Sequence, residues 1–346
     1  MTATMSAALK HRLFWPVAAL ILLLTADQIY RPGFLSVRMQ DGHLYGNLID
    51  ILHTGAPIAL IALGMTLVIA SRGIDLSVGA VVAIAGAISC SYIVNSPSPG
   101  SLSATVVSVL IALVAGLILG AWNGYLVSTI GIQPIIATLV LMVAGRGIAQ
   151  LITAGQIVTV HNDFYKAIGA GYVLTMPVSV LVTAAAFVLA GVLTRRTALG
   201  TLIEAIGINP IASRLAGLKA RSIIWIVYVA SGLCAAIAGL MITSNVTAAD
   251  ANNGGLYIEM DAILAVVIGG TSLRGGRYSL VGTIIGAFVI STLTTTVYAL
   301  GVPANQSLVF KAPVVIAVCV LQAPRALELF RRWRRSSGLR TEAAAA

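Results

Sequence analysis

Residues 64–88 read GMTLVIASRGIDLSVGAVVAIAGAI, and this stretch decides what kind of fold the chain can adopt. Apolar runs flank the interruption at 71–79, which contains an arginine, an aspartate and two glycines. A helix needs roughly 20 predominantly apolar residues to cross a bilayer, and glycine beside charge breaks such a run. The stretch therefore predicts a membrane helix that is interrupted at 71–79.

The composition of the whole chain agrees with an all-α polytopic membrane protein. Of its 346 residues, 58% are hydrophobic and 9% are charged, and the mean hydropathy is +0.98. So few charged residues cannot cover so much apolar surface in water, which excludes a soluble globular domain. We expect one transmembrane domain over 1–346, with its 34 glycines helping helices to pack closely.

About ten membrane helices are expected, and they follow one another with little sequence left for other domains. The apolar stretches lie near 13–30, 56–71, 76–94, 104–121, 134–152, 176–194, 222–243, 257–270, 279–300 and 307–323. The first could be the apolar part of a signal peptide, but no A-x-A-like cleavage site follows it. An uncleaved first helix is the preferred interpretation.

Basic residues predict which way the chain is inserted. If the N-terminus is cytoplasmic, sixteen of the 21 Lys and Arg residues fall on the cytoplasmic side, and only Arg31, Arg38 and Lys166 fall outside. The C-terminus then returns to the cytoplasm with a basic tail at 324–346, which would face anionic lipid headgroups. The net charge of +10 is thus an orientation signal, and no nucleic-acid-binding pattern accompanies it.

A second interruption, GGTSLRGGR at 269–277, resembles the first in composition. The preceding residues 67–69 (LVI) and 266–268 (VVI) suggest a possible internal repeat, as in many transporters, although coincidence is an equal alternative in a chain so rich in Val, Ile and Gly. Helix punctuation explains both breaks, and substrate contact is the less favoured alternative. The residues expected to turn or cap the chain here are Gly73, Asp75, Ser77, Gly79, Gly275 and Gly276.

The hydrophilic loop at 194–221 is predicted to be cytoplasmic. Apolar residues recur in it at helical spacing, and Gly207 with Asn209-Pro210 should divide it into two short helices. Such short amphipathic helices must lie on the membrane or dock into a partner. The loop alone favours the membrane surface.

Five stretches in collinear order carry a resemblance that spans nearly the whole chain. They are 64–88, QPIIATLVLMVAGRGIAQLITAGQ (133–156), TALGTLIEAIGINPIASRLAG (197–217), YVASGLCAAIAGL (228–240) and DAILAVVIGGTSLRGGRYS (261–279). Together they resemble the permease subunits of monosaccharide ABC importers of the ribose and galactofuranose type. The stretches 39–52, 145–159 and 249–253 are most similar to the galactofuranose branch.

This resemblance implies a permease of the bacterial inner membrane that translocates galactofuranose or a similar monosaccharide. Its implied partners are a cytoplasmic ATPase, a second permease and a periplasmic sugar-binding protein. The loop would then dock as a coupling helix onto the ATPase through Glu204, Ala205, Ile206, Gly207, Asn209, Pro210 and Gly217. No lysine lies in a G-x-x-x-x-G-K-[ST] motif, so ATP and Mg²⁺ would be bound by the partner, and this chain would need no cofactor.

Polar residues in or beside apolar segments are candidates for the translocation pathway and for binding-protein contact. Arg146 is notable because a charge inside an apolar helix usually faces a cavity or a partner; its neighbours Gly145 and Gly147 would let another backbone approach and accept its donors. The pathway candidates are Asn123, Gln133, Arg146, Gln150 and Gln156, and the binding-protein candidates in an outer loop are Asp250, Asn252 and Asn253. No residue is assigned a catalytic role, and the histidines lack metal-ligand spacing.

Three alternatives stay open at this level. A ribose- or xylose-type permease acting as a homodimer would differ in cargo and pairing, and a secondary transporter would not need ATP. An intramembrane enzyme would need paired acid and base groups at membrane depth. The ten segments contain no histidine, and their acidic residues Asp27, Glu259 and Asp261 are expected near outer helix ends.

Overall fold

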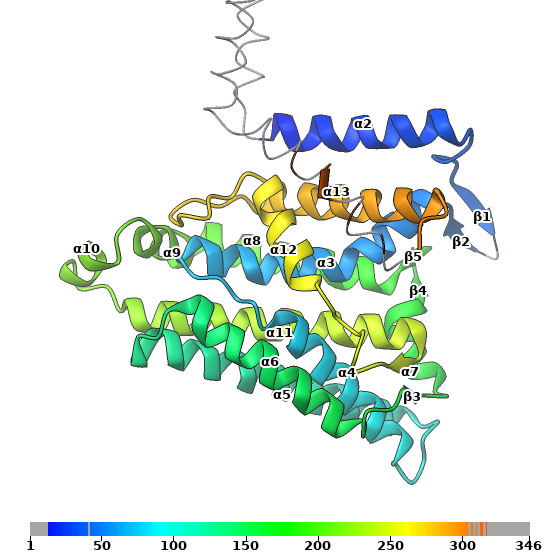
Figure 1. Cartoon of the computed structure of the whole chain (residues 1–346), viewed down its shortest axis with the longest axis horizontal. Coiled ribbons are helices and arrows are strands. Elements are labelled where there is room, and N and C mark those ends of the chain that lie inside the picture. Colours follow the sequence, from blue (N-terminus) through cyan, green and yellow to red (C-terminus); the bar gives the residue numbers. More distant parts are fainter. Residues whose placement is uncertain are drawn as a thin grey trace, which may run out of the picture.

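The computed structural model describes residues 13–40 and 42–303, together with Gln306, Val309, Ala312, Pro313 and Ile316. Most of the predicted segment 307–323 and all of the basic tail 324–346 lie outside the described residues. Within the described part the chain is mainly helical, and its long helices run roughly along one common direction (Figure 1).

The helices differ in length, and the strands are all short. The helices are α2 (Phe14–Tyr30), α3 (Asn47–Ala70), α4 (Val78–Val94), α5 (Leu102–Tyr125), the π-helical turn η1 (Leu126–Ile130), α6 (Pro134–Ile152), α7 (Asp163–Ala170), α8 (Val178–Arg196), α9 (Leu199–Ile208), α10 (Pro210–Leu215), α11 (Ala220–Val246), α12 (Ile258–Ile268) and α13 (Leu280–Ala299). The antiparallel strand pairs are β1 (Arg38–Gln40) with β2 (His43–Tyr45), β3 (Val158–Thr159) with β6 (Ala248–Ala249), and β4 (Tyr172–Val173) with β5 (Met176–Pro177).

The polytopic helical membrane architecture predicted from the sequence is confirmed in its coarse form. Among the described residues, six helices are long and apolar enough to span a bilayer: α3, α5 with η1, α6, α8, α11 and α13. Helices α2 and α4 have 17 residues each and α12 has 11. Nine of the ten predicted segments thus coincide with helices, but the number of crossings stays a prediction.

Helices α3 and α11 form the centre of the bundle. Helix α3 packs against α8, α11, α12 and α13, while α11 packs against α3, α4, α5 and α7. The main core consists of buried side chains from α3, α4, α11, α12 and α13, among them Leu60, Ile69, Val81 and Ile290. Helix α2 contacts α13 at the edge of the bundle (Figure 1).

Glycines bring the backbones of α5 and α11 together. Side-chain atoms added at Gly120 would overlap the Tyr228 carbonyl, and those added at Gly232 would overlap the Gly116 carbonyl. Small residues let helices approach closely in lipid, where apolar burial provides no driving force for helix association. The α5–α11 contact therefore depends on these positions lacking a side chain.

The two ends of the bundle differ. Helices α9 and α10 project from one end, whereas α7 and the strands β1, β2, β4 and β5 lie at the other end (Figure 1). Long helices thus separate a helical projection from an end made of hairpins and connections.

Replacing Gly232 with leucine is expected to destabilise the bundle by roughly 3 kcal/mol, because backbone atoms of α5 cannot move aside as a side chain could. The measurement is thermal unfolding of the full-length protein in detergent, followed by size-exclusion chromatography. Gly147→Leu is the matched control, since nothing lies within 4 Å of a Cβ atom at that position of α6. Equal melting temperatures for the two variants would contradict the close α5–α11 contact.

Candidate functional site

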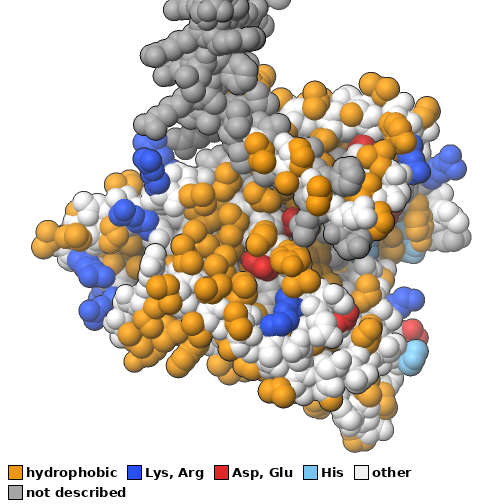
Figure 2. Space-filling view, in the orientation of Figure 1, with side chains coloured by type: hydrophobic (Ala, Val, Ile, Leu, Met, Phe, Trp, Pro, Cys, Tyr) orange, Lys and Arg blue, Asp and Glu red, His pale blue; other side chains and the backbone are white. Residues whose placement is uncertain are grey.

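The projecting end formed by α9 and α10 exposes apolar side chains. Ile211 and Leu215 are 72% and 85% exposed, and Ile208 beside them is exposed as well. The Asn209 side chain divides the two helices, because its Oδ1 accepts hydrogen bonds from the backbone N–H groups of Ile211 and Ala212 at 3.1 and 3.0 Å. Figure 2 shows hydrophobic and basic side chains together at this end. We call the exposed side chains of Ile208, Ile211 and Leu215 the tip surface.

The residues predicted to couple to an ATPase divide into two groups. Ile206 and Gly207 are buried against the bundle, and Glu204 and Ala205 are half-buried. Asn209, Pro210 and Gly217 lie at the projecting side, where Pro210 opens α10 and Gly217 has the positive φ of a turn that ends it. The tip surface was not predicted, although Ile211 and Leu215 are among the apolar residues that recur at helical spacing in the loop. Periodicity finds an apolar face but cannot tell which part of it the bundle leaves uncovered.

The buried side of α9 meets both predicted breaks. A Cβ atom at Gly207 would overlap the Ala70 carbonyl, at the end of α3, and the backbone of Gly276. The Gly276 N–H donates a hydrogen bond to that carbonyl at 2.9 Å. Gly275 lies against Arg72 and the Gly207 carbonyl. The three segments are therefore joined through backbone atoms.

The first break extends from this contact into the bundle. Asp75 is 1% exposed, and its Oδ1 accepts hydrogen bonds from the backbone N–H and the hydroxyl of Ser77 at 3.1 and 2.6 Å. Its Oδ2 accepts from the Ser231 hydroxyl at 2.8 Å. Since Ser231 lies about 16 Å along α11 from Ala220, Asp75 lies well inside the bundle, away from the end where α9 and α10 project. The residues after Arg72 carry the chain back into the bundle before α4 begins, as the trace that links α3 to α4 shows in Figure 1.

Asn123 belongs to this buried network. Its amide donates a hydrogen bond to the Ser77 hydroxyl at 2.8 Å, and its side chain is fully buried. Gly73 lies against the Tyr228 hydroxyl, so a side chain there would not fit. Asn123 thus contacts the segment that leads into α4, and its place in a translocation pathway stays a prediction.

A second segment, made of successive turns between β6 and α12, enters the bundle from the opposite end (Figure 1). Arg146 on α6 donates hydrogen bonds to the Ala251 carbonyl at 3.2 Å and to the Gly254 carbonyl. One turn further along α6, the Gln150 amide donates to the Asn252 Oδ1 at 2.8 Å. The carbonyls of another segment accept the Arg146 donors, an arrangement that the glycines beside Arg146 suggested. The segment at 250–254 is therefore attached to α6.

Asp250 organises the turn that opens this segment. Its carboxylate accepts hydrogen bonds from the Asn253 amide at 2.7 Å and from the backbone N–H groups of Asn252 and Asn253. The Asn253 amide, with those backbone groups and the positive charge of Arg146, holds the pKa of Asp250 below its usual value. The carboxylate is thus charged at neutral pH. Contact of these exposed residues with a binding protein stays a prediction.

The N-termini of α4 and α12 meet inside the bundle. Gly79, in the first turn of α4, lies against the Gly255 carbonyl and the Glu259 carboxylate, which belongs to the first turn of α12. Glu259 is 6% exposed. The expectation that Glu259 lies near an outer helix end was wrong, because α12 begins within the bundle, after the segment at 250–257. Helix N-termini carry partial positive charge, which a carboxylate balances.

The remaining candidates lie apart from this junction. Gln133 and Gln156 are exposed near the two ends of α6, Gln133 immediately before it and Gln156 after it.

Figure 2 shows acidic and basic side chains in the middle of an otherwise largely apolar face. Among the described residues, no group of three or more His, Cys, Asp or Glu side chains could hold a metal ion.

Comparison with known proteins identifies the family. A model described as the permease component of the branched-chain amino acid transport system matches residues 47–318, which includes both breaks and the projecting helices. The chain belongs to this permease family. Membership makes it a transport component rather than a catalytic enzyme, and it agrees with the resemblance drawn from the sequence.

Several relatives of the permease have names that describe sugar transport. It is 48% identical to the galactofuranose transporter permease protein of Escherichia coli, over 93% of this chain and 94% of the relative. It is 43% identical to the fructose import permease protein of Bifidobacterium longum, over 97% and 95% of the two chains. The ribose import permease protein of Haemophilus influenzae is 37% identical over 88% and 90%. No solved structure matches the chain.

Arg146→Met should release the segment at 250–257 of the permease. Hydrogen exchange of its backbone amides is expected to accelerate by about tenfold or more, because hydrogen bonds from a charged donor are worth about 1.5–3 kcal/mol each. Lys166→Met removes the same charge from an exposed site on α7 and should leave exchange in this segment unchanged. Equal exchange in the wild type and Arg146→Met would refute the role of Arg146 in holding the segment.

Proposed function

We propose that the permease is the membrane-spanning translocation subunit of an ATP-driven bacterial importer, and that its cargo is galactofuranose or a similar monosaccharide. A periplasmic binding protein would deliver the sugar, and a second permease would complete the pathway. The 48% identity to the galactofuranose transporter permease protein over nearly the full length of both chains supports this cargo.

The tip surface is the observation that carries the proposal. Exposed Ile208, Ile211 and Leu215 project from the end of the molecule where Arg195, Arg214 and other basic residues collect, and aqueous surroundings disfavour such apolar exposure. A short helix with an uncovered apolar face fits a groove on a partner. Since the sequence contains no P-loop, the ATPase, with its ATP and Mg²⁺, is the partner that this surface requires.

Docked there, the ATPase would act on the interior of the permease through α9. Gly207 contacts the end of α3 and the Gly276 backbone, and each of these segments leads to a break. Closing of the ATPase would shift α9, and the breaks would allow the bundle to change between outward- and inward-open arrangements. This assigns the breaks a role as hinges between the projecting end and the buried junction.

The buried junction favours an uncharged cargo over the amino acids in the family's description. In many transporters, the N-termini of broken helices attract an anionic group of the substrate. Here Asp75 lies before α4, and Glu259 lies beside the first turns of both α4 and α12, so acidic side chains of the chain itself already occupy these helix N-termini. Sugars present hydroxyl groups rather than a carboxylate. A ribose- or xylose-type homodimer is the alternative cargo and pairing, supported by the ribose permease relatives.

The orientation of the permease in the membrane follows from the same proposal. With the tip surface in the cytoplasm, the hairpin end faces the periplasm, both termini are cytoplasmic, and ten crossings are needed. In the bacterial inner membrane, Asp250, Asn252 and Asn253 would then be accessible to the binding protein. The exposed basic residues of α8–α11 lie at the cytoplasmic end in this orientation, as the positive-inside rule requires.

An internal repeat is part of the proposal as well. After α3, the Gly73 N–H donates to the Val68 carbonyl at 2.9 Å, and after α12 the Thr271 N–H donates to the Val266 carbonyl at 3.2 Å. Arg72 and Gly270, one residue earlier in each case, both have positive φ. This shared helix end aligns Val68 with Val266, one residue away from the register suggested by the sequence. Such caps are common at helix ends, so they support the repeat only modestly.

The double variant Ile211→Asp, Leu215→Asp is expected to weaken binding of the ATPase by about 30-fold, as the loss of a central apolar contact typically does. Binding is measured with the purified permease complex in lipid nanodiscs. Leu174→Asp provides the control, because Leu174 is 87% exposed in the turn between β4 and β5, at the other end of the molecule. If both variants bound the ATPase like the wild type, the tip surface would not be the docking site.

Cargo is tested by uptake in cells. Deleting this gene should reduce the uptake of labelled galactofuranose to the level of cells without the importer, while labelled leucine uptake stays unchanged. Loss of leucine uptake instead would reject a sugar cargo. Uptake that persists in vesicles lacking the ATPase would point to a secondary transporter.

A further inference from the structure

A groove between α8 and α13 combines an apolar floor with two arginines. Its volume is about 360 Å³, within the range of about 300–1,000 Å³ typical of ligand sites. Its lining residues are Phe187, Val188, Gly191, Val192, Arg195, Arg196, Leu280, Val281 and Ile284. The lining contains two basic residues and no acidic one, so the groove is amphipathic with a positive end.

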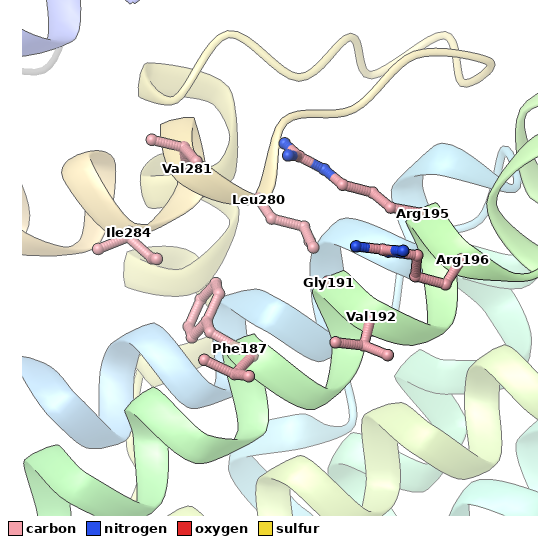
Figure 3. Close-up of a pocket in the computed structure, with 9 residues that line it drawn as sticks. Phe187, Gly191, Val192, Arg195, Arg196, Leu280, Val281 and Ile284 are labelled. Atoms are coloured by element: carbon pink, nitrogen blue, oxygen red, sulfur yellow. The ribbon is translucent and has the colours of Figure 1, made fainter.

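Figure 3 shows how the two kinds of side chain are arranged. Arg195 and Arg196 extend from the last turn of α8 toward the Leu280 end of α13, while Phe187 and Ile284 lie further along the groove. The distance from Phe187 to Arg195 along α8 is about 12 Å. A charged end and an apolar floor of this length match a phosphate group followed by the upper part of an acyl chain.

The arginines already have a structural role, but it does not explain the groove. Basic residues in the last turn of a helix balance its dipole, and their stems can extend along apolar surface to reach the headgroup region. That role requires no depression between two helices. The groove exists because Gly191 has no side chain, and a Cβ atom added there would have nothing within 4 Å.

We infer that this groove binds an anionic phospholipid, with its phosphate on Arg195 and Arg196 and an acyl chain along α8 and α13. Val188, Val192 and Val281 are exposed apolar side chains on helices long enough to span the bilayer, so the groove opens toward lipid rather than toward water. Basic pockets between membrane helices recognise acidic headgroups in this way. The inference requires the membrane location, but neither the cargo nor the ATPase.

The bound headgroup would lie at the corner where α8 turns into α9. Only Thr197 and Ala198 lie between the arginines and the start of α9. Gly200 on α9 lies against the Thr194 carbonyl and the Tyr278 hydroxyl. A lipid held by Arg195 and Arg196 would therefore stiffen the base of the projecting end. The phosphate would contact the connection between α8 and α9, through which a movement of α9 would reach the bundle.

The test is titration of phosphatidylglycerol into the full-length permease in detergent, with bound lipid counted by native mass spectrometry. The Arg195→Gln, Arg196→Gln variant is expected to weaken binding by about 30-fold, since both charges that attract the headgroup are lost. Lys219→Gln, Arg221→Gln removes the same charge from exposed positions at the start of α11 and should bind like the wild type. Equal binding by all three proteins would overturn the site.

Two further measurements distinguish binding of the acyl chain from binding of the headgroup. Gly191→Leu should fill the groove and reduce phosphatidylglycerol binding, whereas Gly147→Leu on α6 should not. Phosphatidylcholine should bind at least tenfold more weakly than phosphatidylglycerol, and inorganic phosphate should not displace the lipid. The inference would be rejected if Gly191→Leu bound the lipid like the wild type, or if inorganic phosphate displaced the lipid. It would also be rejected if no lipid were retained because another part of the importer fills the groove.

Discussion

The need to satisfy backbone polar groups inside the bundle governs this structure. Helices α4 and α12 both begin in the interior, where their first backbone N–H groups need partners within the protein, because each unsatisfied group in an apolar environment costs several kcal/mol. Asp75 accepts a hydrogen bond from the Ser77 backbone just before α4, and Glu259 lies beside the first turns of both helices. Burial of a carboxylate is costly by itself, and the donors of Ser77 and Ser231 offset part of this cost for Asp75.

These interior helix starts explain why the two breaks contain glycine. A side chain at Gly79 in the first break would overlap the Glu259 carboxylate, and one at Gly276 in the second break would overlap Ile208 at the end of α9. The junction and the projecting end are connected by few residues, since Ala70 contacts α9 and Asp75 lies five positions later. The end of α3 is thus an element that the two regions share.

Much of this architecture could be predicted from the sequence, because hydrocarbon imposes a simple rule on apolar segments. Length and hydropathy located most of the long helices, and Asn209-Pro210 located the division between α9 and α10. Depth was harder to predict. An extended residue advances more than twice as far as a helical one, so the few residues around Asp75 were enough to carry the start of α4 into the bundle. Glu259 was misplaced because α12 begins within the bundle, after the turns at 251–257, and the contact of Asn123 was not predicted because its partner Ser77 lies on the segment that re-enters the bundle.

The contact among Gly207, Ala70 and Gly276 has a mechanical consequence. Side chains between moving segments can change rotamer and absorb part of a displacement, but these three segments touch through their main chains. Such a joint has little compliance. A small shift of α9 must then either be shared by α3 and the loop before α13 or break the hydrogen bond between Gly276 and Ala70, so this contact suits displacements of short range.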